Sequence, residues 1–255
     1  MSEKVKLKSK LQKFTNYISN LIFPRDIKCI FCGEELNNKA SNSTCEICYP
    51  ILPFIKKSCP KCGGLITEEN TGVCVDCKIN NYNFTMAMSV FEYIDQPLNV
   101  IQKLKYNGKK YLAKPLGYYL AQRLATENIN IDYITFVPIH ETKLKLRKFN
   151  QAELLAKEVG SLLNITCLPL CIKKINTKSQ TELSFKERKA NVKDSFEFKK
   201  EYKSTIKGKN ILIIDDVFTT GATCNEVSSV ILKAGASNCY VLTLAHVKVE
   251  PISSS

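Results

Sequence analysis

Two adjacent carboxylates, Asp215 and Asp216, end a strongly apolar segment and could hold sugar hydroxyls or a divalent cation. The preceding residues 211–214 are Ile-Leu-Ile-Ile. Three of these four are β-branched, which predicts a strand buried on both faces. Open α/β sheets bind their ligands at the carboxyl ends of such strands, so the acidic pair stands where a ligand is expected.

A run of small and hydroxyl residues follows the acidic pair and leads into an amphipathic helical pattern over 222–235. A turn of this composition can direct several backbone N–H groups at one anion, and the helix adds its positive end. We therefore expect a site for a phosphorylated sugar with a divalent ion. The phosphate-binding candidates are Thr219, Thr220, Gly221, Ala222 and Thr223.

Two other interpretations fit part of this segment. An apolar strand ending in two acids also occurs as the metal-holding strand of ATPases. That reading requires a G-x-x-x-x-G-K-[ST] loop, and neither Gly108-Lys109 nor Gly208-Lys209 has the earlier glycine. The segment could also be a capped strand–turn–helix whose acids are simply solvated.

A second group of candidates follows the strand that ends at Val137. Lys143, Lys145 and Arg147 alternate with apolar residues, so several of these cations could point the same way. Cations on a loop at the carboxyl end of a strand can neutralise a departing pyrophosphate. Alone, the run would be a solvated surface; beside the acidic pair and the phosphate-binding run, it completes a candidate catalytic set.

Eight of the twelve cysteines form four C-x-x-C pairs, and gaps of twelve and eleven residues separate the members of successive couples. Glycine follows the first and third pairs, as it does in zinc knuckles. The spacing predicts two closed, structural Cys₄ zinc sites, with iron–sulfur binding as the competitor. We favour sequential pairing, and a cross-braced arrangement stays open. The pairs are Cys29/Cys32, Cys45/Cys48, Cys59/Cys62 and Cys74/Cys77.

Composition narrows the function classes. The 255 residues carry 37 Lys+Arg against 24 Asp+Glu, a formal charge of +13 that favours polyanionic partners. No apolar run is long enough to cross a membrane, and the N-terminus does not resemble a secretory signal, so we expect a cytoplasmic protein. In a reducing compartment, twelve cysteines indicate metal binding rather than disulfides.

The elements that position these groups follow an α/β pattern from about residue 84. Strand-like runs alternate with helical patterns, which predicts one mostly parallel sheet with helices on both faces. The polar segment 173–209 is expected to be a functional loop with short strands or a flexible hood. The strands are expected at 86–93, 133–139, 166–172, 210–215 and 239–246, and the helices near 97–127, 149–163 and 222–235.

The expected domains are an N-terminal amphipathic helix over 1–22, a double zinc ribbon over 23–80 and an α/β domain over 84–250. Lysines line one side of the first helix. Such a helix most often docks on its own protein, although it could also contact a membrane surface or a nucleic acid.

The segment from Ile211 to Thr223 resembles the PRPP-binding motif of type I phosphoribosyltransferases, where PRPP is phosphoribosyl pyrophosphate. The resemblance implies that Asp215 and Asp216 hold the ribose hydroxyls and that residues 219–223 hold the 5′-phosphate. Purine-salvage members often have an Asp base where this chain has Thr219, which argues against purine salvage.

Further motifs are similar to the ComF family signature. These are V-P-I-H at 137–140, F-N-Q-A-x-L-L-A at 149–156 and the tandem cysteine pairs before a phosphoribosyltransferase-like domain. Gln180, Leu183, Arg188 and Asn191 belong to the same signature, as do Leu104-Lys105-Tyr106 and Gly108. The chain departs from the family in having Lys143 and Lys145 where Arg is usual, and Lys148 where Gly is usual.

The family resemblance implies a protein of natural competence that receives single-stranded DNA and binds PRPP with Mg²⁺. One alternative is an active phosphoribosyltransferase with a base or amine as acceptor. There Asp215 and Asp216 would hold the ribose, while Lys143, Lys145 and Arg147 would neutralise the pyrophosphate. The other is a non-catalytic, zinc-headed adaptor that recruits a competence helicase or a DNA-uptake channel.

Overall fold

The computed structural model describes residues 28–36, 42–66, 72–175 and 192–247. The chain forms two compact units, Met1–Ile51 and Leu52–Ser255. The helix expected over 1–22 lies outside the described residues. The domain boundaries at 23–80 and 84–250 stay a prediction. Within the described ranges, no helix is long and apolar enough to cross a bilayer.

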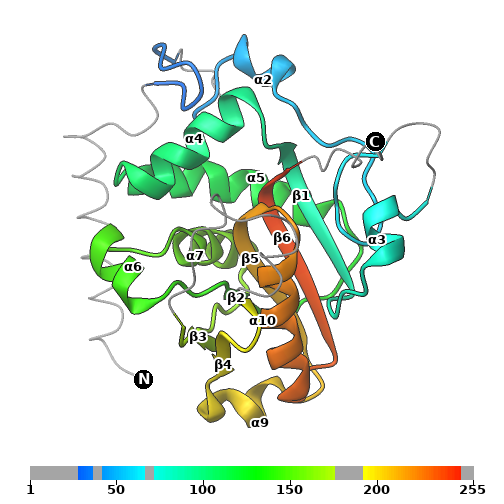
Figure 1. Ribbon diagram of the computed structural model, residues 1–255. Helices are drawn as coiled ribbons and strands as arrows, with labels where there is room; N and C mark the ends of the chain where they lie inside the picture. The colour runs from blue at the N-terminus through cyan, green and yellow to red at the C-terminus, as the bar shows by residue number, and fades with distance from the viewer. Residues whose placement is uncertain (1–27, 37–41, 67–71, 176–191, 248–255) are drawn as a thin grey trace, which may run out of the picture. The chain divides into compact units, whose positions relative to one another are not determined.

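A four-stranded parallel sheet forms the centre of the second unit (Figure 1). The strand order is β1 (Met86–Glu92), β6 (Asn238–His246), β5 (Asn210–Phe218) and β2 (Tyr133–Phe136). All three neighbouring pairs are parallel, so the carboxyl ends of the strands meet at one edge. Residues 211–214 of β5 are buried, as their apolar run predicted.

Helices cover both faces of this sheet, which confirms the expected fold class. On one face, α10 (Ala222–Lys233) packs Val227 and Ile231 against Ile211 and Ile213 of β5. The alternate β5 residues point to the opposite face, where α5 (Ala113–Ala125) and α7 (Gln151–Leu163) contact the sheet. Figure 1 shows α10 in front of β5 and β6, with α5 and α7 behind them.

Two elements that were predicted from the sequence differ in the structure. The helix expected over 97–127 is two helices, α4 (Asp95–Tyr106) and α5, separated by Gly108 at φ +66° and the 3₁₀ turn η1 (Lys110–Leu112). The strand expected over 166–172 is interrupted: Cys167 makes a single bridge to Ile134. Pro169 follows and has no N–H to donate to a ladder.

A small antiparallel sheet stands in place of that fifth strand. It pairs β3 (Cys171–Lys173) with β4 (Phe196–Phe198), and η3 (Lys200–Tyr202) and α9 (Lys203–Ile206) follow. The polar segment 173–209 therefore contains the short strand β4, which agrees with the prediction of a loop with short strands. Its residues 176–191, including Gln180 and Arg188, lie outside the described part of the chain.

The residues around the third cysteine pair run along the outer edge of β1. Glu92 donates its N–H to Pro53 O at 2.9 Å, Ile55 to Val90 O at 2.9 Å, and Ala87 to Lys61 O at 2.8 Å. This backbone pairing covers an edge that would otherwise be open for association with another strand. The two cysteine-bearing helices, α2 (Cys48–Ile51) and α3 (Val75–Ile79), belong to the first and second units, respectively.

Gly63 and Gly33 occupy matching positions after a C-x-x-C pair, and both have positive φ, at +72° and +86°. A Cβ on Gly63 would lie 2.6 Å from Ala87 O, whereas nothing lies within 4 Å of one on Gly33. We predict that Gly33→Ala costs about 1 kcal/mol for its backbone conformation alone. Gly63→Ala should cost at least 2 kcal/mol more, because the knuckle must move away from β1. Thermal unfolding of the zinc-loaded variants measures the difference, and equal losses would contradict this packing.

Candidate functional site

The carboxylate of Asp216 is buried and fully engaged by two segments that are distant in the sequence. Its Oδ1 lies 2.9 Å from Nζ of Lys105 on α4, and its Oδ2 accepts a hydrogen bond from Nε2 of Gln151 at 2.8 Å. Only 6% of the Asp216 side chain and 16% of the Lys105 side chain are exposed. A buried charge needs such partners, because the loss of one would leave the other uncompensated.

Asp215 is the second carboxylate of the site, and like Asp216 it lines the pocket. Its Oδ1 accepts the backbone N–H of Asp216 at 2.8 Å, and its Oδ2 lies 4.0 Å from Sγ of Cys224. Burial, and after it the neighbouring charge of Asp216, raises the pKa of Asp215 to about 7. A carboxyl with such a pKa changes its charge close to neutral pH.

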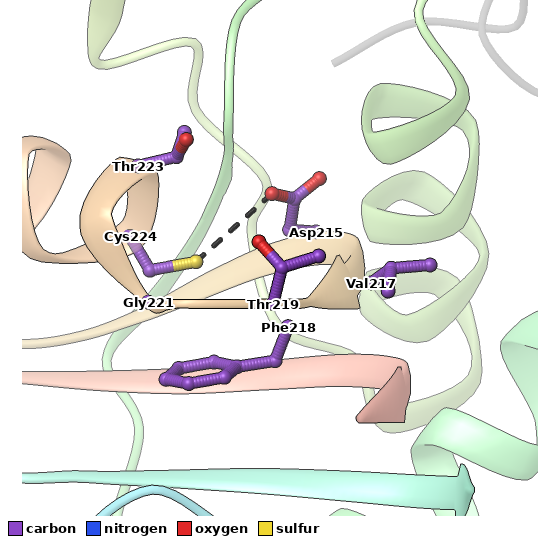
Figure 2. Close-up of a pocket in the computed structure, with 7 residues that line it drawn as sticks. All are labelled: Asp215, Val217, Phe218, Thr219, Gly221, Thr223 and Cys224. Atoms are coloured by element: carbon purple, nitrogen blue, oxygen red, sulfur yellow. Dashed lines mark hydrogen bonds between the residues drawn. The ribbon is translucent and has the colours of Figure 1, made fainter. Parts of the chain in front are cut away.

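The residues after β5 form a tight turn, residues 219–221, which we call the β5–α10 turn. Gly221 has φ +69°, and a Cβ there would clash with the ring of Phe218 and lie 3.0 Å from Tyr82. Only glycine fits this position. Figure 2 shows Asp215 and Thr219 on one side of the end of β5 and Phe218 on the other. Thr223 and Cys224 lie in the first turn of α10, which begins at Ala222. The predicted phosphate-binding residues thus surround one helix start.

The cations of the second group lie on a helix, α6 (Glu141–Arg147), and not on the loop expected from their alternation. Because an α-helix repeats every 3.6 residues, Lys143 and Arg147 share a face while Lys145 points away. Lys143 and Arg147 line the pocket. Lys145 is 76% exposed and pairs with Glu141 at 3.5 Å, so the structure does not bring it to the acidic pair.

Lys148 ends α6 in the left-handed conformation at φ +63°. This is the position where the ComF signature that the sequence resembles usually has glycine, and the expected conformational cost for lysine is therefore present. The next residues anchor α7: Asn150 accepts the N–H of Ala152 at 3.0 Å and donates to Val137 O at 2.9 Å. That anchor places Gln151 against Asp216.

These elements enclose a pocket of about 320 Å³ at the carboxyl ends of β5 and β2. Four cations and the two carboxylates line it, which gives the pocket an excess of positive charge. Such a lining suits a ligand with both hydroxyls and several phosphate charges. The cations are Lys105, Lys143, Arg147 and Lys173; the other lining residues include Tyr93, Tyr106, His140, Gln151, Thr219 and Thr223.

Lys105, Gln151 and Lys173 line the pocket, but no role was predicted for them from the sequence. Lys105 and Gln151 belong to motifs of the ComF signature, and this membership was the only feature of the sequence that pointed to them. Lys173 had no signal, since only the position of β3 brings it to the pocket. Burial, and after it the charge of Lys143, lowers the pKa of Lys173 to about 8.

The eight paired cysteines form two clusters, Cys29/Cys32/Cys45/Cys48 and Cys59/Cys62/Cys74/Cys77. The sulfurs of each cluster lie within 4.8 Å of one another, and Cys32–Cys45 and Cys62–Cys74 are each 3.7 Å apart. Tetrahedral zinc with Zn–S bonds of about 2.3 Å places its sulfurs about 3.8 Å apart, so both clusters fit the ion. Sequential pairing is confirmed.

Comparison with known proteins agrees with this arrangement. Residues 18–78 match the double zinc ribbon domain. The chain is 29% identical over 228 residues to "Competence protein F" of Haemophilus influenzae, which covers 86% of this chain and 97% of that protein. It is 26% identical over 232 residues to "Competence protein ComFC" of Streptococcus pneumoniae, covering 86% and 99%. Together these similarities support a ComFC-like protein.

The chain is also similar to other proteins. It is 27% identical over 206 residues to "DNA utilization protein YhgH" of Salmonella typhimurium, covering 78% of this chain and 88% of that protein. Among solved structures, an adenine phosphoribosyltransferase from Thermoanaerobacter pseudethanolicus has 16% identity and a TM-score of 0.35. The match covers 55% of this chain and 83% of that one. At such a TM-score, the fold assignment depends on the strand order itself.

Asp215 and Asp216 should respond oppositely to neutralisation. The raised pKa of Asp215 means that its contribution to stability is present below the unfolded value near 4 and is lost as pH rises through about 7. Asp215→Asn should therefore stabilise the protein at pH 8 by about 1–2 kcal/mol, or roughly 3–6 °C in Tm, and by little at pH 4. Asp216→Asn should destabilise it at both pH values, because Lys105 loses its partner.

Thermal unfolding in magnesium-free buffer measures both variants against the wild type. A loss of stability for Asp215→Asn at pH 8 would contradict the assigned environment of that carboxyl.

Proposed function

We propose that this protein acts in the uptake or utilization of DNA and binds PRPP with Mg²⁺ at the carboxyl end of β5. The competence and DNA utilization proteins to which it is similar support the first part. The observation that supports the second is the pocket itself. The pocket brings together the carboxylate of Asp215, the turn at Gly221 where α10 begins, and the cations of α6. Lys105 is paired with the other carboxylate, that of Asp216.

The residues fit a phosphorylated sugar in distinct ways. Asp215 accepts hydrogen bonds from ribose hydroxyls, while Asp216, held by Lys105 and Gln151, fixes the position of its neighbour. The β5–α10 turn and the first turn of α10 supply backbone N–H groups and hydroxyls for the 5′-phosphate. Lys143 and Arg147 face the pyrophosphate. Mg²⁺, when bound, neutralises the phosphate charge and orients the ligand.

Whether the ligand reacts is a separate matter. Phosphoribosyl transfer requires an acceptor, and a proton-accepting group beside it. Thr219 stands where purine-salvage enzymes often carry an acid, and a hydroxyl does not accept a proton near neutral pH. We therefore propose binding as the function and regard transfer to a base or amine, and the non-catalytic adaptor, as the alternatives.

Isothermal titration of the zinc-loaded protein with PRPP and Mg²⁺ tests the site. We expect micromolar binding, a loss of at least tenfold for Asp215→Asn, and a change of less than twofold for Glu153→Gln. Glu153 pairs with Lys157 on α7 and does not line the pocket, so it controls for the loss of one carboxylate. If the wild type fails to bind, the phosphoribosyl site is wrong.

Single-stranded DNA is the polyanion we propose as partner. Besides the charge of +13, the stretch from Lys103 to Tyr111 holds Lys103, Lys109 and Lys110 together with two tyrosines, Tyr106 and Tyr111, that are 61% and 66% exposed. Exposed aromatic rings among cations can stack on bases while the cations contact phosphates.

We predict that Tyr111→Ala weakens binding of a fluorescent oligothymidylate by about 5- to 100-fold. Leu162→Ala, which removes an exposed apolar side chain from α7, should leave the affinity unchanged. Fluorescence anisotropy at several salt concentrations measures both, and the affinity should fall as salt rises. Equal affinity of the two variants would exclude Tyr111 from the DNA contact.

A further inference from the structure

Tyr82, which follows the last cysteine of the second Cys₄ cluster by five residues, lies against the β5–α10 turn. Its hydroxyl donates a hydrogen bond to the backbone O of Thr220 at 3.0 Å, and its ring closes the space beside Gly221. The next residue, Asn83, donates its N–H to Oδ1 of Asn225 in α10 at 2.6 Å. One short segment therefore holds both the turn and the start of the helix.

A second connection runs through Phe218, on the side of β5 away from Asp215 (Figure 2). The Phe218 ring stacks on His246, with centroids 4.8 Å apart and an interplanar angle of 15°. The His246 ring packs on Gly64, where an added Cβ would lie 2.7 Å from it. Gly64 O accepts the N–H of the zinc-ligand candidate Cys59 at 2.8 Å. The stack thus extends from the knuckle to the turn.

Apolar packing joins the same parts. Cys59, Cys62 and Cys77 are buried in one cluster with Phe84, Phe218 and the α10 residues Ala222 and Cys224. The Tyr82 ring stacks on Phe84 with centroids 4.8 Å apart. The second Cys₄ cluster is therefore part of the core beneath the turn.

We propose that the second Cys₄ site keeps the β5–α10 turn in its anion-binding conformation, with Tyr82 and the Phe218–His246 stack as positioning residues. The clusters fit zinc, and metal binding supplies folding free energy to such knuckles. Without it, the supports on both sides of Gly221 are lost, and a ligand must order the turn as it binds. The role of the turn in binding phosphate rests on the function proposed above.

Hydrogen exchange of the ligand-free protein tests the coupling without any ligand. Cys74→Ser and Cys45→Ser are matched variants: both thiols are half-buried, and both backbone N–H groups face the first cysteine sulfur of their cluster, at 3.3 and 3.5 Å. With one zinc lost from each, Cys74→Ser should speed exchange in peptides covering 218–224 by at least about tenfold. Cys45→Ser, in the other compact unit, should change it less than about twofold. Equal exchange of these peptides in both variants would overturn the proposal.

Tyr82→Phe serves where Cys74→Ser fails to fold. It keeps the ring and removes the hydrogen bond to Thr220, so we expect unchanged zinc content and a fall in Tm of no more than about 4 °C. We also expect faster exchange at 219–221 and PRPP–Mg²⁺ affinity lower by about 3- to 10-fold. Tyr240→Phe, which removes a tyrosine hydroxyl from β6, is the control and should change neither the exchange at 219–221 nor the affinity. If residues 219–221 exchange in Tyr82→Phe as they do in the wild type, the coupling is wrong. If they exchange faster but the wild-type protein does not bind PRPP, only the proposed ligand is wrong.

Discussion

A buried carboxylate has to be neutralised where it lies, and this requirement ties the end of β5 to two helices. Asp216 receives Lys105 from α4 and Gln151 from α7, and those contacts fix the strand end against both elements. Its neighbour Asp215 also lines the pocket, and its Oδ1 accepts the backbone N–H of Asp216. Two identical residues thus differ in role: Asp216 is committed to the protein, and Asp215 remains available to a ligand.

The two zinc knuckles also differ despite matching sequences. The first lies in its own compact unit, whereas the second pairs its backbone with β1 and buries its cysteines in the core of the α/β unit. Gly63 shows the difference most directly, because a β-carbon there would meet the backbone of β1, while the same addition at Gly33 meets nothing. The second knuckle therefore lies in the same compact unit as the parallel sheet.

Local patterns predicted the features that depend on local chemistry. The apolar run before Asp215 predicted a buried central strand, and cysteine spacing predicted both Cys₄ clusters with their pairing. The sequence could not reveal which side chains satisfy Asp216, because that choice depends on packing between segments far apart in the chain. The structure also separates Lys145 from the two cations with which it was grouped. The alternation of cations and leucines suggested an extended loop, but these residues form a helix, whose period separates Lys145 from Lys143 and Arg147.

The central claim is that the β5–α10 turn and Asp215 hold a phosphorylated ribose while Asp216 stays paired with Lys105. The most direct test is a crystal structure of the zinc-loaded protein with PRPP and Mn²⁺, whose anomalous signal locates the ion in place of Mg²⁺. We predict the 5′-phosphate against the backbone N–H groups of residues 219–223, ribose hydroxyls on Asp215 and an intact Lys105–Asp216 pair. A phosphate bound away from the turn, or a metal that displaces Lys105 from Asp216, would contradict the account.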